Sequence, residues 1–99
     1  MTNDSRGYMG TRKAAAELPV SLRDVWLRII KACHELTGKT GEFAKKWLPD
    51  FRHDRLNLTR LERYGILEQT DSVRGGHRAY WRMPDREGVE KALRELGYL

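Results

Sequence analysis

Side chains that can bind anionic groups and nucleobase edges gather in two stretches of this 99-residue chain. Guanidinium groups donate paired hydrogen bonds to phosphate and guanine, and carboxamide groups pair with adenine. The first stretch contributes Arg52, His53, Arg55, Asn57, Thr59 and Arg60. The second contributes Arg74, Gly75, Gly76, His77 and Arg78, where the glycines allow a tight turn with positive φ. These residue types favour binding of an anionic polymer.

Catalytic residues show no comparable arrangement. Asp50, His53 and Asp54 crowd together, but they lie near the expected start of a helix, where capping explains the carboxylates. Gly75-Gly76 lacks the Gly-x-x-Gly-Lys pattern of a phosphate-binding loop, and no serine lies in a nucleophile elbow. We therefore expect no enzymatic activity, no cofactor, no metal site and no identifiable small-molecule ligand.

Composition points to the same class of partner. Nineteen Lys and Arg against fourteen Asp and Glu give a net charge of +5, which favours polyanions. Cys33 is the only cysteine, so an intrachain disulfide is excluded, and we expect a small buried hydrophobe. No apolar segment approaches the length of a signal peptide core or a membrane span, so we expect a cytoplasmic protein with no membrane partner.

The elements that would position the basic residues follow from periodicity. Residues 1–19 show little of it and predict a flexible basic N-terminal arm, and residues 20–99 predict a single domain. A capping box at Ser21 to Asp24 opens a helix that Thr37-Gly38 should end. Its apolar stripe consists of Leu22, Val25, Trp26, Ile29, Ile30, Cys33 and Leu36.

Two shorter helices are expected next. Thr40 would cap a helix over 41–48, with Trp47 inward and Lys45 and Lys46 outward. A third helix would begin near residue 52 or 54, bury Leu58 and Leu61, and end at Gly65.

A hairpin and a last helix complete the expected order. Residues 66–70 and 77–83 form strands joined by a turn over 71–76, with Trp81 facing the core and Tyr80 on the other face. Asp85 caps the last helix, which ends at Gly97. Its stripe consists of Val89, Ala92, Leu93 and Leu96. Val89, Leu93 and Leu96 together with the terminal Tyr98-Leu99 exceed what one small core needs, so we expect a homodimer.

This order resembles a winged helix-turn-helix domain of small bacterial and archaeal transcription regulators. The motifs that carry the resemblance are Thr40-Gly-Glu-Phe-Ala44, Leu58-x-x-Leu-Glu-x-x-Gly-Ile-Leu67 and Arg74-Gly-Gly-His-Arg-Ala-Tyr80. The resemblance covers Ser21 to about Met83. It implies an α+β fold that is mainly α, with three helices, a two-stranded hairpin called the wing (residues 71–78) and a C-terminal helix.

The resemblance also implies double-stranded DNA as the partner and transcription regulation as the function. The helix over about 52–64 would read the major groove, and the wing would contact the minor groove or the backbone. Lys45, Lys46 and the helix start at Thr40 would suit phosphates.

Several alternatives remain open at this point. Each basic residue could belong to an ordinary solvated helix face. The domain could instead dock a protein or RNA without sequence-specific DNA binding, or bind a single strand by stacking on Tyr80. The N-terminal arm could follow a DNA backbone instead of fraying in solvent.

Overall fold

The computed structural model describes residues 6–48, 58–70 and 80–99. Its elements, in chain order, are α1 (Arg6–Glu17), α2 (Val20–Thr40), β1 (Glu42–Ala44), the 3-10 helix η1 (Lys45–Trp47), α3 (Thr59–Arg63), β2 (Glu68–Gln69), β3 (Tyr80–Arg82) and α4 (Arg86–Glu95). The coarse prediction of an α+β chain that is mainly helical is confirmed.

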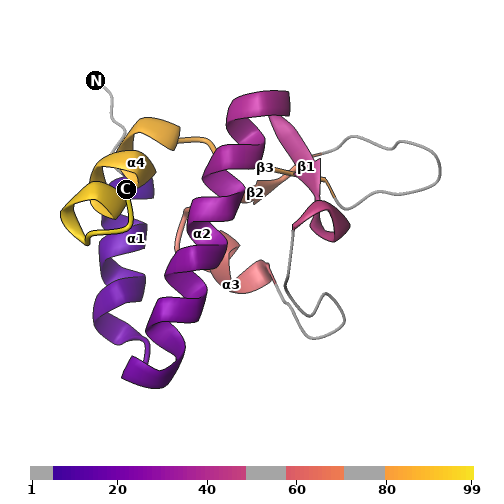
Figure 1. Cartoon of the computed structure of the whole chain (residues 1–99). Helices are drawn as coiled ribbons and strands as arrows, with labels where there is room; N and C mark the ends of the chain where they lie inside the picture. Colours follow the sequence, from indigo (N-terminus) through magenta and orange to yellow (C-terminus); the bar gives the residue numbers. More distant parts are fainter. Residues whose placement is uncertain (1–5, 49–57, 71–79) are drawn as a thin grey trace.

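Helix α2 is the centre of the molecule (Figure 1). The pair α1 and α4 lies on one side of it, and the small sheet lies on the other. Leu27, Ile30 and Cys33 of α2 are at most 1% exposed, and they join the core to which the sheet and α4 also contribute. Every other element is therefore positioned by its packing on α2 or on a neighbour of α2.

Both predicted ends of α2 were wrong. The helix begins at Val20 after Pro19, and no side chain caps it, so the box at Ser21 is not formed. It continues through Thr37-Gly38, where the buried Thr37 hydroxyl donates to the carbonyl oxygen of Cys33, 2.9 Å away. It ends where Gly41 adopts a φ of 84°, the left-handed conformation that glycine accepts readily.

The predicted second helix is a strand followed by a 3-10 turn. In β1, Phe43 is fully buried and lies opposite Trp81 of β3. Pairing with β3 supplies backbone hydrogen bonds and a buried site for the Phe43 ring, and this tertiary context outweighs the helical spacing of the segment. Thr40 therefore caps no helix, and Lys45 and Lys46 belong to η1.

The sheet has three strands in the order β1-β3-β2, with both pairings antiparallel. Pairing of the two predicted strands is confirmed over a shorter length, with Glu68 opposite Arg82 and Gln69 opposite Trp81. The Nη2 atom of Arg82 donates to Oε2 of Glu68 at 2.8 Å. The predicted turn over 71–76 lies outside the described residues.

The end of the third helix is confirmed. Leu58 and Leu61 are at most 2% exposed, and the helix stops at Gly65 with a φ of 81°. Ile66 and Leu67 follow at once and are buried, so the helix leads directly into β2. Its predicted start near residue 52 or 54 lies outside the described residues.

The flexible arm predicted over 1–19 was wrong for the residues that the structure describes. Residues 6–17 form α1, which buries Gly7, Gly10, Thr11, Ala14 and Ala15. Its backbone comes so close to the chain after α3 that a Cβ on Gly10 would collide with the carbonyl oxygen of Tyr64. Small residues thus hold α1 on the core, because they let the two backbones come into direct contact.

The last helix is confirmed, but its apolar stripe does not support the homodimer predicted from it. Asp85 caps it by accepting a hydrogen bond from the Gly88 N–H at 3.1 Å. Val89, Ala92 and Leu93 are each 0% exposed because α1 and α2 cover them. The stripe therefore belongs to this chain's own core and gives no reason for a homodimer, which stays a prediction.

Within residues 6–48, 58–70 and 80–99, no helix combines the length and the apolar character needed to cross a membrane.

Candidate nucleic-acid interface

The outward side of α3 carries two exposed guanidinium groups, on Arg60 and Arg63. Leu58 and Leu61 hold the opposite side in the core. The Arg60 guanidinium carbon lies 5.5 Å from the ring centroid of Trp26 on α2, a cation–π contact. Because the ring contacts one face of the planar guanidinium, the N–H groups at its edges can still donate to a ligand.

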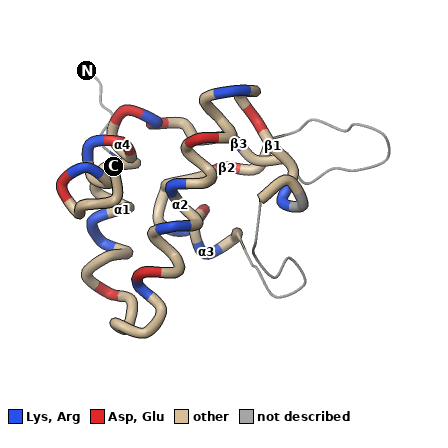
Figure 2. The backbone as a smooth tube through the Cα atoms, viewed as in Figure 1, with Lys and Arg blue, Asp and Glu red and all other residues tan. Residues whose placement is uncertain are grey.

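Charge is unevenly distributed around α2 (Figure 2). In this view the positions on η1 and most of those on α3, to the right of α2, are cationic, whereas cationic and acidic positions are mixed on α4, to its left. Carboxylates on the α4 side pair within the chain, as in the contact of Glu90 with Arg94 at 2.7 Å. On α3 the two exposed arginines are accompanied by one exposed acid, Glu62, so the helix carries an excess of positive charge, which favours an anion.

The predicted site residues are only partly described. Arg60 is exposed and Thr59 is half-buried, both on α3. The others of the two predicted stretches lie outside the described residues, namely Arg52, His53, Arg55, Asn57, Arg74, Gly75, Gly76, His77 and Arg78. Arg63, which the site prediction did not include, is added by its position one turn after Arg60.

The helix start predicted at Thr40, on which its phosphate contact rested, was wrong. Thr40 is the last residue of α2, and its hydroxyl donates to the carbonyl oxygens of Leu36 and Glu42. A helix C-terminus carries partial negative charge and repels anions. Lys45 lies half-buried in η1 just beyond this point, and Lys46 follows it.

The burial of Trp47 and Tyr80 is the reverse of the prediction. Tyr80 is buried, at 8% exposure, whereas Trp47 is 40% exposed. Their rings meet edge to face, with centroids 5.9 Å apart and planes at 87°. Ala44 of β1 lies opposite Tyr80, and η1 follows Ala44 directly, which brings Trp47 to the Tyr80 ring. The burial of Tyr80 contradicts the alternative in which it stacks on a single-stranded base.

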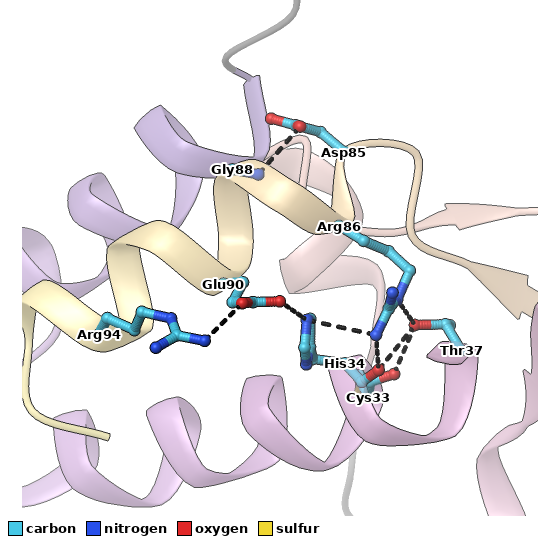
Figure 3. Close-up of polar contacts among 8 residues, drawn as sticks. All are labelled: Cys33, His34, Thr37, Asp85, Arg86, Gly88, Glu90 and Arg94. Carbon is cyan, nitrogen blue, oxygen red and sulfur yellow. Dashed lines mark hydrogen bonds and ion pairs between the residues drawn. The ribbon is translucent and has the colours of Figure 1, made fainter. Parts of the chain in front are cut away.

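A polar cluster fixes α4 against α2 at a distance from α3 (Figure 3). The Arg86 guanidinium donates from Nη2 to the His34 carbonyl oxygen at 2.8 Å and from Nε to the Thr37 hydroxyl at 3.0 Å. The Nε2 atom of His34 lies 3.3 Å from Oε1 of Glu90. This cluster positions helices, and its donors are used within the chain.

Burial and charge set the protonation of this cluster. Burial of the imidazole, followed by the nearby Arg86 guanidinium, lowers the pKa of His34. The hydrogen bond from Arg94 lowers the pKa of Glu90. Cys33 is fully buried, as predicted for a core residue, and this burial raises the pKa of its thiol.

No group of His, Cys, Asp and Glu side chains in the described part of the chain could hold a metal ion. Comparison with protein-family models, curated proteins and solved structures found no match. The function must therefore be inferred from the chain's own residues and their geometry.

Proposed function

We propose that this chain binds double-stranded DNA as a winged helix-turn-helix transcription regulator. The observation that carries the proposal is the pair of exposed guanidinium groups, Arg60 and Arg63, on the outward side of α3. The order α2, β1, α3, β2, β3 and the strand order β1-β3-β2 support it, since α3 leads directly into the strand pair. The residues between β2 and β3 in the sequence include Arg74 and Arg78.

In this proposal α3 enters the major groove. Arg60 donates a pair of hydrogen bonds to a guanine edge, and Trp26 restricts the orientations that its guanidinium samples before binding. Lys45 and Lys46 contact backbone phosphates, and Arg74 and Arg78 contact the backbone or the minor groove. Arg52, His53, Arg55 and Asn57 stay predicted contacts of the same interface.

The test compares two variants of one helix. Arg60→Gln removes a cation and a bidentate donor from α3, whereas Glu62→Gln removes a neighbouring exposed acid. In anisotropy titrations of a duplex selected from a random library, Arg60→Gln weakens binding by about 1–3 kcal/mol. Glu62→Gln does not weaken it. Equal affinities for the wild type and Arg60→Gln would remove α3 from the interface.

The wing is tested separately. Arg74→Ala/Arg78→Ala should make the dependence of affinity on salt shallower by about two contacts. An unchanged salt dependence would take the wing out of the proposal.

The homodimer remains part of the proposal without the support of the α4 stripe. Light scattering at micromolar concentration gives its mass directly. A mass of 11.6 kDa, that of one chain, would contradict the dimer.

The second candidate function is a protein-interaction or RNA-interaction module. Exposed apolar side chains favour it, since Leu22 is 44% exposed, Val25 46% and Trp47 40%. Duplex RNA serves as a competitor in the same titration. Preference for duplex RNA over duplex DNA would support this second candidate against the first.

A further inference from the structure

A hollow of about 330 Å³ lies where α1 meets the C-terminal end of α3. Its lining residues are Arg6, Met9, Gly10, Lys13, Arg63 and Tyr64. Three of these side chains are cationic and none is acidic. Glu17 lies beside the hollow, since it pairs with Lys13 and accepts a hydrogen bond from the Tyr64 hydroxyl at 3.2 Å, but the cations outnumber it, so the lining favours an anion. Apolar atoms of Met9 and the Tyr64 ring form the rest of it.

Close backbone contacts hold the two sides of the hollow together. Gly10 of α1 packs directly on the carbonyl of Tyr64, and Gly65 faces Arg6, whose Cβ is 3.7 Å from the position of a Cβ on Gly65. Cations from α1 and α3 are thus kept side by side by the fold before any ligand arrives. Such preorganisation reduces the cost of ordering them around an anion.

The cations of the hollow are not committed to strong ion pairs. Arg6 lies 3.5 Å from Glu68, whose side chain is half-buried, and Lys13 lies 3.9 Å from Glu17, with both of these side chains exposed. Exposed pairs of this length contribute little. Arg63 forms no ion pair with any residue in the described ranges.

We propose that this hollow binds a phosphodiester of the DNA backbone, next to the groove contact of α3. This inference rests on the proposed function. Arg60 and Arg63 are three residues apart on one helix, so a duplex that contacts Arg60 passes close to the hollow. The deoxyribose carbons beside a phosphodiester offer apolar surface to Met9 and Tyr64, which inorganic phosphate does not.

The neighbouring Arg12 provides a contrast within α1. Its Nη1 atom donates to Oε1 of Glu95 at 2.8 Å, on the α4 side of the helix. Arg12 and Lys13 are thus adjacent in the sequence, but only Lys13 lines the hollow. Replacing either residue by glutamine changes the net charge by the same amount. Comparing the two variants therefore distinguishes a contact in the hollow from an effect of overall charge.

The experiment measures anisotropy of a labelled duplex with the full-length chain across a salt series. The variants are Lys13→Gln and Arg63→Gln, with Arg12→Gln as the matched control. Loss of one phosphate contact reduces the slope of log affinity against log salt by about one. We expect that reduction for Lys13→Gln and for Arg63→Gln, and the wild-type slope for Arg12→Gln. Thermal melts verify that all three variants fold.

The possible failures of this experiment are distinguishable. If the wild type binds the duplex and all three variants share its slope, the hollow is not a backbone contact, although the proposed function stands. If the three variants lose slope equally, only net charge matters and the inference is overturned. A wild type that binds no duplex at low salt overturns the proposed function and this inference together.

Two further titrations separate other sources of the anion. Inorganic phosphate should displace the duplex no better than chloride at equal ionic strength. A backbone contact would be contradicted by two results together: inorganic phosphate displaces the duplex from the wild type but not from Lys13→Gln, and Lys13→Gln keeps the wild-type slope for the duplex. The hollow would instead bind an acidic peptide if polyglutamate binding is lost in Lys13→Gln and Arg63→Gln while both variants keep the wild-type slope for the duplex.

Discussion

The guanidinium of Arg60 lies over the ring of Trp26, and this contact joins the short helix α3 to the central helix α2. Arg60 is exposed and Trp26 is half-buried against the core. A residue of the core thus restricts the conformations of a residue proposed to contact DNA. The two side chains should therefore be coupled in binding.

Replacement of Trp26 tests that coupling. Trp26→Leu keeps an apolar side chain but removes the ring face, so a cation–π contribution of about 0.5–1 kcal/mol is lost. We expect Trp26→Leu to weaken duplex binding in the wild type and to have no effect in an Arg60→Gln background. Anisotropy titrations of the four proteins of this double-mutant cycle give the coupling. Equal effects of Trp26→Leu in both backgrounds would show that the ring does not act through Arg60.

Gly10→Ala tests the docking of α1. In a frayed arm this change would be neutral or favourable, since alanine stabilises a helix by about 1 kcal/mol relative to glycine. Here the added Cβ collides with the Tyr64 carbonyl, so we expect a loss of about 1–3 kcal/mol in the free energy of unfolding. Urea denaturation measures it.

The control for this prediction is Ala16→Gly on the exposed side of α1. It should cost only the helix propensity, about 1 kcal/mol. A stability gain in Gly10→Ala would mean that α1 does not pack on the chain after α3.

The two largest errors of the sequence prediction, α1 and β1, have different physical causes. In α1 the buried positions Gly7, Gly10, Thr11 and Ala14 follow helical spacing, but their small side chains give little hydrophobic signal. That spacing was the signal that could have found the helix. For β1 the cause is non-local, since Phe43 is placed by its pairing with Trp81, 38 positions later in the chain.

Leu93→Ala tests whether the α4 stripe belongs to the core of one chain. Leu93 is 0% exposed, so its truncation should lower the free energy of unfolding by about 2–5 kcal/mol. The loss should be the same at all protein concentrations, because no second chain is needed to cover the stripe. If the change in melting temperature caused by Leu93→Ala depends on protein concentration, Leu93 instead lies at a subunit interface.

His34 makes stability depend on pH. Its pKa is lowered in the folded state by burial and by Arg86, against the opposing effects of Glu90 and Glu35. The unfolded chain therefore binds a proton more readily than the folded chain. The stabilising contribution is present above the unfolded value of about 6.5 and is lost as pH falls below it.

Urea denaturation at a series of pH values checks this prediction. His34→Gln should flatten the stability profile between about pH 7 and pH 5, where histidine titrates. The lowered pKa of Glu90 predicts a separate loss of stability at more acidic pH, which His34→Gln should reduce but not abolish because Arg94 is its largest cause. A wild-type profile that rises as pH falls through 6.5 would contradict the lowered pKa.

Local signals gave the parts of the fold that were predicted well. Asp85 caps α4 and Gly65 ends α3 because a capping carboxylate and a glycine with positive φ act within a few residues. The candidate site was predicted less well. Arg60 was identified by its place in the third helix, but Arg6, Lys13 and Arg63 come together only when α1 docks against the end of α3.

Binding to duplex DNA is tested most directly by titrating the wild-type chain with labelled mixed-sequence duplex at increasing salt. We expect a linear fall of log affinity with log salt and a slope of about −5 to −6, from the phosphate contacts of Lys13, Arg63, Lys45, Lys46, Arg74 and Arg78. Such a slope would support an interface built on backbone phosphates. No binding at low salt, or an affinity that does not change with salt, would contradict DNA binding by this chain.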